Sequence, residues 1–294
     1  MTVLLWMLGL QSAPIDQLER CLEQKDRACV SGLLSKRPAE ASAQYLAAAA
    51  RGYMLLGKMV DAINAISRAV ELDPGRYGYL MEQGWIYQRS GDQPSAIHAF
   101  LLAAKIKPAS PDVFYELGMS FFFAHEYQRA ARHFVHALEL DPRSDRAQFM
   151  LGLVAIWSDQ FPEAEVRFRK AIELRPSSSD YLLHYGVLLA KMEQNDRAIE
   201  HMLKAEKIDP SNPLTHFNLG KVYRKQNRLP DARRELEAAV SLRPAFSAAL
   251  YQLAGVYRQL GNAEKGRWAL DQFQKYVALE KEREEDPVDA AVSH

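Results

Sequence analysis

A regular spacing of prolines constrains the fold of this chain more than any other feature of its sequence. Six prolines lie 34 residues apart: Pro74, Pro108, Pro142, Pro176, Pro210 and Pro244. Similarity at a fixed period of about 20 to 50 residues is the signature of a repeat array. The prolines define seven repeats, which are Ala43–Arg76, Tyr77–Ser110, Pro111–Ser144, Asp145–Ser178, Ser179–Asn212, Pro213–Phe246 and Ser247–Glu280.

Small residues recur at two positions of each repeat. The first holds Gly84, Gly118, Gly152, Gly186 and Gly220, with Ala50 and Ala254 in the outer repeats; the second holds Ala62, Ala96, Ala130, Ala164, Ala198 and Ala232, with Gly266 last. Two helices can cross closely where both carry a small residue, while larger side chains pack around the contact. Phe100, Phe134 and Phe168 share one such packing position. Each repeat is therefore expected to be a helical hairpin.

The repeats resemble those of the tetratricopeptide repeat family. The family pattern of a Leu-Gly pair, a Tyr, an Ala, a Phe, an Ala and a closing Pro is matched repeat by repeat from Ala43 to about Glu280. Its tyrosine position holds Tyr53, Tyr87, Tyr223 and Tyr257, whereas Phe121, Ala155 and Leu189 depart from the pattern. The resemblance implies an all-α fold, a right-handed superhelix (an α-solenoid) of tandem hairpins whose first helices line a concave surface.

Turn residues mark the end of the first helix in several repeats. Gly57, Gly91 and Gly261 share one offset in the repeat. A glycine there can adopt the left-handed conformation that ends a helix at little cost. Asp159 and Asn227 stand at the same offset and also tolerate that conformation.

Two segments precede the repeats, residues 1–13 and residues 14–42. The first contains the apolar run Val3–Leu10, which fits either a cleaved secretory signal or a helix that caps the array. A signal would place the protein in the periplasm or outside the cell, and a cap would leave it in the cytoplasm. Residues 14–42 are expected to form a capping hairpin with helices at Ile15–Glu23 and Arg27–Leu34.

The two cysteines of the chain, Cys21 and Cys29, lie at equal distances on either side of Lys25. In an antiparallel hairpin they would face each other, which permits a disulfide in an oxidising compartment. Two inert thiols are the main alternative. A metal or redox site is less favoured, because no third ligand is nearby and the spacing is not Cys-x-x-Cys.

The last repeat has Ala278 where the others have proline. The second helix is therefore expected to continue through Ala269–Glu285 and to cap the last hydrophobic layer. Residues 281–294 are expected to be a charged helix end followed by a tail.

The charge balance gives no preference for a polyanion. The chain has 37 Lys and Arg residues and 37 Asp and Glu residues, so its overall field favours neither nucleic acid nor a basic partner. The apolar run near the N-terminus is too short to span a bilayer. We therefore expect a protein or peptide partner, with a homo-oligomer as an option, and neither nucleic acid nor a membrane span.

The family resemblance implies that a partner contacts the first helices. The matching residues are Met81, Trp85, Tyr115, Met119, Phe122, Phe149, Leu153, Trp157, Leu183, Phe217, Lys221, Arg224, Tyr251 and Arg258. This groove should be apolar and aromatic over most of its length and basic toward its C-terminal end. Some family members hold a C-terminal carboxylate in a clamp of lysines, asparagines and an arginine. The matching positions here read Ala47, Arg51, Glu82, Asp112 and Glu116, so that clamp is absent.

These features predict a non-catalytic scaffold that binds a peptide or protein segment in the groove. One alternative is structural self-association, and another is weak binding of an anionic polymer by the basic repeats. Part of the aromatic stripe could also be ordinary core between repeats.

Catalytic motifs are scarce. The sequence has neither a Gly-rich phosphate loop nor a Ser nucleophile motif, and the repeats leave no room for a catalytic domain. His133 and His136 are three residues apart but lack a convergent acid, which favours surface or interface histidines over a metal site. We therefore expect no enzymatic activity and no cofactor.

Overall fold

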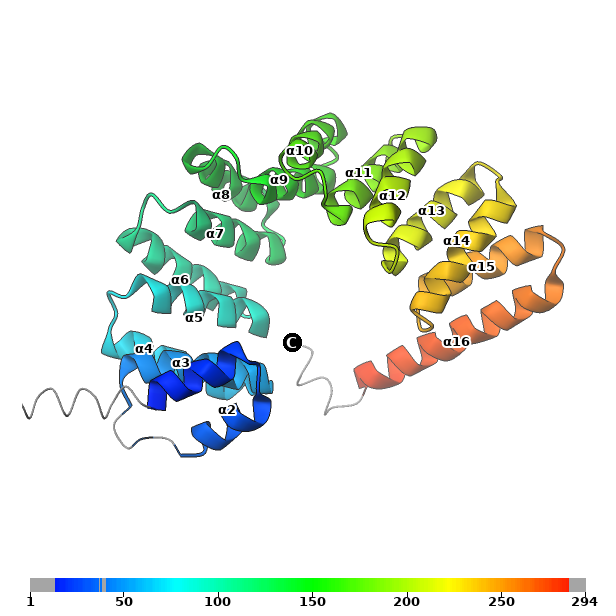
Figure 1. Cartoon of the computed structure of the whole chain (residues 1–294). Coiled ribbons are helices and arrows are strands. Elements are labelled where there is room, and N and C mark those ends of the chain that lie inside the picture. Colours follow the sequence, from blue (N-terminus) through cyan, green and yellow to red (C-terminus); the bar gives the residue numbers. More distant parts are fainter. Residues whose placement is uncertain (1–13, 37, 39–40, 286–294) are drawn as a thin grey trace, which may run out of the picture. The chain divides into compact units, whose positions relative to one another are not determined.

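The computed structural model describes residues 14–36, 38 and 41–285. These residues form helices joined by short connections, and they contain no strand (Figure 1). The candidate signal at residues 1–13 and the expected tail at residues 286–294 lie outside the described residues. Among the described helices, none is both long enough and apolar enough to cross a membrane.

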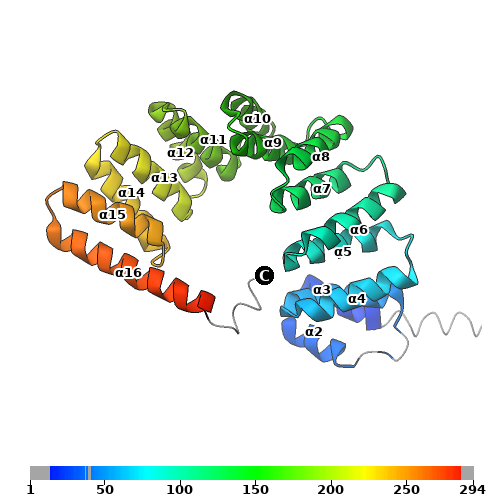
Figure 2. The same cartoon turned by 180° about the vertical axis from the view of Figure 1, so that it is seen from behind.

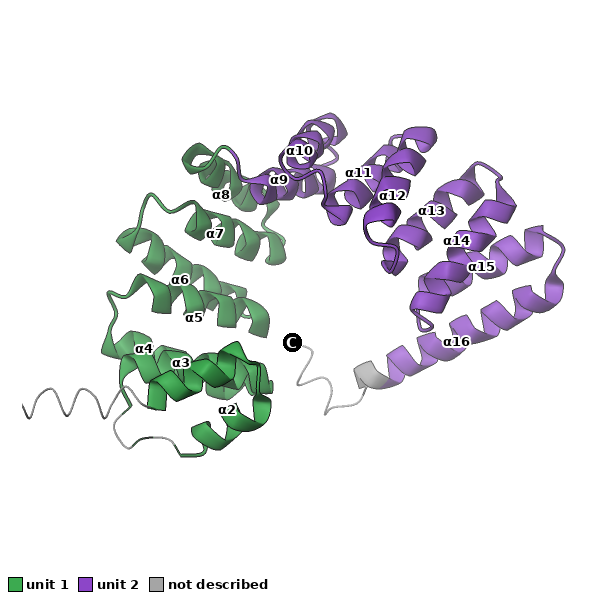
Figure 3. Cartoon of the chain, viewed as in Figure 1, with its two compact units in different colours: residues 1–142 green, residues 143–294 purple. Residues whose placement is uncertain are grey.

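The chain divides into two compact units, residues 1–142 and residues 143–294 (Figure 3). In unit 1, a helical segment at residues 14–23 is followed by α2 (Arg27–Leu34), α3 (Ala43–Leu56), α4 (Met59–Leu72), α5 (Tyr77–Ser90), α6 (Gln93–Ile106), α7 (Pro111–Phe123) and α8 (Tyr127–Leu140). Unit 2 contains α9 (Asp145–Trp157), α10 (Phe161–Leu174), α11 (Ser179–Lys191), α12 (Asn195–Ile208), α13 (Pro213–Lys225), α14 (Leu229–Leu242), α15 (Ser247–Gln259) and α16 (Ala263–Glu285).

Within each unit the helices pack in hairpins. In unit 1, α3 packs on α4, α5 on α6 and α7 on α8; in unit 2, α9 packs on α10, α11 on α12, α13 on α14 and α15 on α16 (Figure 2). The first helices of neighbouring hairpins also touch, as α11 and α13 do, and α13 and α15. The predicted all-α fold of tandem helical hairpins is confirmed. We call the surface formed by α3, α5 and α7 in unit 1, or by α9, α11, α13 and α15 in unit 2, the first-helix face of that unit.

Every repeat turns at one left-handed residue after its first helix. The residues with positive φ at this position are Gly57, Gly91, His125, Asp159, Glu193, Asn227 and Gly261. The sequence predicted five of them from residue type. His125 and Glu193 were not predicted, because neither residue favours the left-handed region. The packing of the two helices therefore imposes this conformation even on unfavourable residues.

The core of each hairpin forms where the small residues were expected. Phe100, Phe134, Phe168, Met202 and Leu236 occupy the same position in successive repeats and are completely buried. The alanine of each second helix, such as Ala130, is buried as well. This layered core is repeated within each unit and does not form a single globule.

The N-terminal hairpin packs on α3. The side chain of Asp26 caps α2 by accepting a hydrogen bond from the backbone N–H of Cys29, at 2.9 Å. The structure joins Cys21 and Cys29 in a disulfide with their Cα atoms 5.9 Å apart. Val30 and Leu34 are buried against Gly52 of α3. The hairpin thereby covers the apolar side of α3, as a terminal cap must.

The last helix, α16, extends far past the point where a proline ends the other second helices. It runs without a break from Ala263 to Glu285, as expected from the alanine at position 278. Ala269 is completely buried in the core cluster that includes residues of α15. Beyond it, Val277 and Leu279 are exposed.

Candidate peptide-binding surface

One row of predicted partner contacts packs mainly between helices. It consists of Met81, Tyr115, Phe149, Leu183, Phe217 and Tyr251, which occupy the same position in successive repeats. Met81 and Leu183 are buried, so the prediction that these two side chains offer surface to a partner is wrong. Burial of this kind arises where a row member faces both its own hairpin partner and the next hairpin, as Phe149 does.

Phe149 illustrates how this row is covered. Its ring stacks on Tyr181 of the following hairpin at 4.5 Å between centroids and lies 5.5 Å from Phe168 of its own hairpin. Tyr115 lies 5.6 Å from Phe134, and Phe217 lies 4.8 Å from Phe246. These aromatic residues are half-buried, so they serve packing between helices as much as a surface.

Large aromatic side chains remain exposed on several first helices, including one member of this row, Tyr251. Trp85 is 45% exposed, Trp157 is 63% exposed and Tyr251 is 57% exposed. Phe123, which the sequence reading did not include, is 52% exposed and precedes Trp157 by one repeat. That spacing was the signal that could have identified it. Met119, Phe122 and Leu153 are half-buried on the same helices.

Unit 2 contains a cavity of about 460 Å³ between α13, α15 and α16. Its lining consists of Arg224, Tyr251, Ala254, Gly255, Arg258, Ala263, Gly266, Arg267 and Leu270. Three of the predicted contacts, Arg224, Tyr251 and Arg258, come together here. We call this site the arginine cavity. Its lining includes no acidic residue, so its electrostatic potential favours an anion.

A second cavity of about 320 Å³ lies on the neighbouring helices α11 and α13. Its cationic lining residues are Lys191, Lys221 and Lys225, and Glu193 is its one acidic lining residue. Glu193 forms an ion pair with Lys225. The ammonium of Lys221 lies 5.2 Å from the centre of the Phe217 ring. The predicted basic character of the C-terminal repeats is thus concentrated in two adjacent cavities.

The first-helix face of unit 1 carries a different polar group. Arg51 donates two hydrogen bonds to Glu19 of the N-terminal hairpin, at 2.5 and 3.0 Å, and its Nε lies 3.3 Å from Glu82 of α5. Burial raises the pKa of Glu82 to about 7, while Arg51 opposes this shift and Glu19 adds to it. Arg51 is shared between two carboxylates, so it neutralises Glu82 incompletely.

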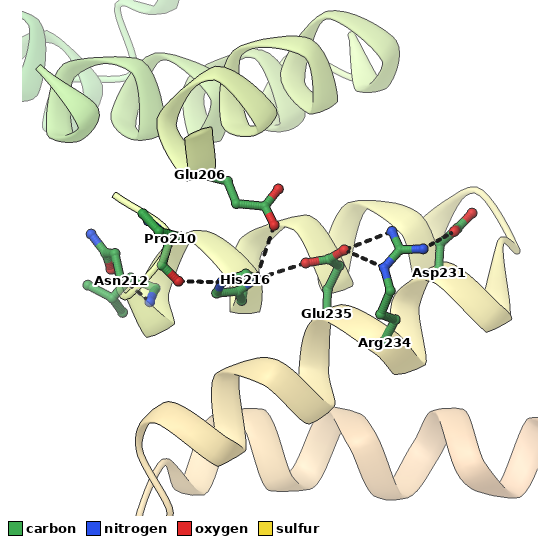
Figure 4. Close-up of polar contacts among 8 residues, drawn as sticks. Glu206, Pro210, Asn212, His216, Asp231, Arg234 and Glu235 are labelled. Carbon is green, nitrogen blue, oxygen red and sulfur yellow. Dashed lines mark hydrogen bonds and ion pairs between the residues drawn. The ribbon is translucent and has the colours of Figure 1, made fainter. Parts of the chain in front are cut away.

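Glu206, His216 and Glu235 form the only group of three metal-ligand residues with converging atoms in the described part of the chain. Figure 4 shows the three side chains pointing toward one another. His216 Nδ1 lies 2.9 Å from Glu235, and its Nε2 lies 3.1 Å from the carbonyl oxygen of Pro210. Arg234 also donates two hydrogen bonds to Glu235, at 2.8 and 3.0 Å.

The hydrogen bonds of this group indicate an ion pair instead of a metal site. The Pro210 carbonyl can only accept, so Nε2 carries a hydrogen, and Nδ1 donates to the Glu235 carboxylate. A ring that donates from both nitrogens has no lone pair for a metal. The hydrogen bond with Glu235 raises the pKa of His216. Burial alone would raise the pKa of Glu235, but the hydrogen bonds from His216 and Arg234 outweigh burial and lower that pKa.

The predicted histidine pair makes aromatic contacts. The ring of His133 stacks on Phe121 with centroids 5.1 Å apart, and His136 meets the edge of Phe114 at 4.1 Å. His136 also pairs with Glu139 at 2.8 Å. The two histidines therefore lie at the interface between α7 and α8 and do not converge on a shared ligand.

The sequence matches two family models. The model described as Tetratricopeptide repeat matches residues 47–112, 115–156 and 217–279, and the model described as TPR repeat matches residues 188–227. No curated protein matches the chain in sequence.

Several solved structures share the fold. A tetratricopeptide repeat protein from Parabacteroides merdae is 17% identical, with a TM-score of 0.67 over 84% of this chain and 98% of its own. YrrB, a TPR protein with an unusual peptide-binding site, is 23% identical, with a TM-score of 0.51 over 62% of this chain and 93% of its own. The APC/C hetero-tetramer Cut9-Hcn1 contains a chain that is 18% identical, with a TM-score of 0.65 over 81% of this chain. The match covers 48% of that protein, about half its length.

Proposed function

Because the chain belongs to the tetratricopeptide repeat family, whose members generally mediate protein–protein interactions, we propose that it is a non-catalytic scaffold that binds segments of another protein on the first-helix faces of its two units. The observation that carries the proposal is the exposure of Trp85, Phe123 and Trp157 on first helices. Large exposed aromatic side chains are the residue type that most often anchors a protein partner. YrrB, with its peptide-binding site on the same fold, supports this use of the fold.

The test replaces Trp85, Phe123 and Trp157 together by Ala. Phe149 is left intact, because it stacks on Tyr181 and its loss would destabilise the fold as well as the surface. A matched control replaces Val60, Leu101 and Val166, which are also exposed but lie on second helices.

Partners captured by crosslinking from extracts of the source cell are identified, and the affinity of each purified partner is then measured for all three proteins. Each true anchor contributes on the order of 1–4 kcal/mol, so the triple variant should bind at least about tenfold more weakly. The control variant should bind like the wild type. Equal affinity of the triple variant would contradict the proposal.

Self-association is a second candidate function, and α16 is the observation that favours it. Trp268, Val277 and Leu279 of this helix are exposed on the last hairpin. A second copy could cover them. Sedimentation measurements over a range of concentrations would show a mass that rises with concentration and returns to that of a monomer when Trp268 and Val277 are replaced by Asp. A constant monomer mass would exclude this candidate.

We also propose that the protein works in an oxidising compartment, the periplasm or the exterior of the cell. The disulfide between Cys21 and Cys29 supports this location, because disulfides persist mainly outside reducing compartments. Mass spectrometry of the protein isolated from its source under alkylating conditions should show Cys21 and Cys29 unalkylated and joined in a disulfide, and an N-terminus that follows the residue 1–13 segment. Free thiols and an intact Met1 would favour the cytoplasm.

A further inference from the structure

We infer that the arginine cavity of unit 2 binds an acidic side chain of the partner segment together with an adjacent apolar side chain. The inference rests on the proposed function, since it names the chemistry of the segment that the first-helix face would hold. It is carried by three observations on the cavity: its arginines, the residue that opens it, and its apolar walls.

Three arginines surround the cavity, and two of them have no partner within the described part of the chain. The side chains of Arg258 and Arg267 make no hydrogen bond or ion pair with any described residue, whereas nine other arginines in the described part of the chain pair with a carboxylate. The third, Arg224, is half-buried and donates to the amide oxygen of Gln252. A guanidinium offers several N–H donors in a fork that matches a carboxylate, so these arginines retain donors for a bound anion.

Gly255 lines the cavity without a side chain that would enter it. The same position in the other repeats holds Arg51, Trp85, Met119, Leu153, Val187 and Lys221. A glycine in the middle of a helix destabilises it relative to alanine, so Gly255 weakens α15. It is also not the small residue at which α15 and α16 cross, since that position is occupied by Ala254.

Gly255 also positions one of the arginines. A Cβ on Gly255 would be 3.2 Å from Nη2 of Arg224, which shows that the guanidinium lies directly over the backbone of α15. A hydrogen bond to Gln252 of the same helix holds it there. Arg224 is therefore oriented before any ligand binds, which lowers the entropy lost on binding.

The walls of the cavity identify the rest of the ligand. Between the arginines lie Tyr251, Leu270 and the small residues Ala254 and Ala263. A phosphate backbone would meet the cations but would gain nothing from the apolar walls. An Asp or Glu next to a Leu or an aromatic residue satisfies both. The zero net charge of the whole chain likewise gives no long-range attraction for a polyanion.

The experiment is a selection from a phage-displayed library of random dodecapeptides on the full-length protein. We expect the enriched peptides to contain Asp or Glu beside an apolar residue. Enrichment of those peptides should be lost on the double variant Arg258→Gln/Arg267→Gln. It should be retained on Arg132→Gln/Arg169→Gln, which makes the same charge change at exposed arginines of second helices.

A synthetic peptide from the selection is then compared with its Asn or Gln counterpart by calorimetry. Replacing the acid should weaken binding to the wild type about tenfold or more, and should have little further effect on the Arg258→Gln/Arg267→Gln variant. Gly255→Leu provides an independent variant. It fills the space beside α15 and displaces the Arg224 guanidinium, but it keeps Arg258 and Arg267 and improves the helix propensity of α15, so it should also abolish binding while the thermal midpoint is maintained.

Three results would overturn the inference: enriched peptides without acidic residues, unchanged binding to the Arg258→Gln/Arg267→Gln variant, or tighter binding of a single-stranded oligonucleotide than of any peptide. Two other results distinguish failure of the proposed scaffold function from failure of this inference. Peptides that lack acids but are lost on the Trp85/Phe123/Trp157 variant would support the scaffold and exclude the acidic ligand. Acidic peptides that bind that variant as well as they bind the wild type would support the acidic ligand and contradict the scaffold proposal.

Discussion

In α7, Gly118 lies so close to the ring of Phe134 in α8 that a Cβ on Gly118 would be 2.5 Å from the ring atom Cε1. The following repeat has the same arrangement, with 2.6 Å between a Cβ on Gly152 and Cε1 of Phe168. Both rings are completely buried and cannot move aside. The glycine of one helix and the phenylalanine of the other therefore fix how closely the two helices of a hairpin approach.

We predict that Gly118→Ala will destabilise unit 1 by about 1–3 kcal/mol, because overpacking forces buried side chains from their preferred rotamers. Gly78→Ala is the control. No atom lies within 4 Å of a Cβ at Gly78, so alanine should leave stability unchanged or raise it slightly. Urea unfolding midpoints measure both. The double variant Gly118→Ala/Phe134→Leu should recover part of the loss, and a loss equal to that of Gly118→Ala alone would show that the ring is not the cause.

Glu193 is the turn residue least suited to its left-handed conformation, with a φ of 61°. Glu193→Gly should stabilise unit 2 by about 1 kcal/mol, because glycine adopts this conformation without a steric penalty. The exposed ion pair with Lys225 would be lost, but such pairs contribute little. Lys225→Gln removes the ion pair alone and serves as the control. A lower thermal midpoint for Glu193→Gly than for Lys225→Gln would refute the strain argument.

The pair of His216 and Glu235 should make the stability of unit 2 depend on pH. The raised pKa of His216 means that its contribution is present below its ordinary value of 6.5 and is lost as pH rises through the folded-state value. The lowered pKa of Glu235 means that its contribution is present above 4.5 and is lost as pH falls through the folded-state value. The stability difference between wild type and His216→Gln should therefore be greatest between these two values.

Adding Zn²⁺ in the same denaturation experiments distinguishes the ion pair from a metal site formed by the same residues. An ion pair predicts no change in the thermal midpoint on adding Zn²⁺. A metal site formed by Glu206, His216 and Glu235 would raise the midpoint of the wild type and not that of His216→Gln. A flat difference between the two proteins across pH would contradict the charged pair.

Glu82 should make the stability of unit 1 fall as pH rises. Its pKa rises from 4.5 to about 7 on folding, so the folded state holds the proton more tightly and loses stability as pH rises through that interval. Glu82→Gln should remove this loss, which amounts to about 1–3 kcal/mol above pH 7. Glu71→Gln, at an exposed site, should leave the pH profile unchanged. This prediction would be wrong if Glu82→Gln were less stable than the wild type at high pH.

The sequence predicted those features that steric matching fixes within one repeat. The paired small residues and the closing prolines defined the hairpins, and Ala278 correctly indicated the long last helix. The extent of burial was harder to predict. The repeat spacing placed Met81 and Leu183 on the correct side of their helices, but how far the neighbouring hairpin covers that side depends on packing between repeats.

The arginine cavity shows another limit of reading the sequence alone. Gly255 resembles one more helix-packing glycine, and only the structure separates it from Ala254, the residue at the helix crossing. Arg267 could not be assigned to the partner-binding surface from sequence, because the family pattern places partner contacts on first helices and Arg267 belongs to a second helix.

The hairpin arrangement also bears on how the chain is made. Extensive helix contacts in the described residues join helices that are adjacent in sequence or separated by one helix. A hairpin emerging from the ribosome thus needs only the next hairpin to complete its packing, and it never waits for a distant segment.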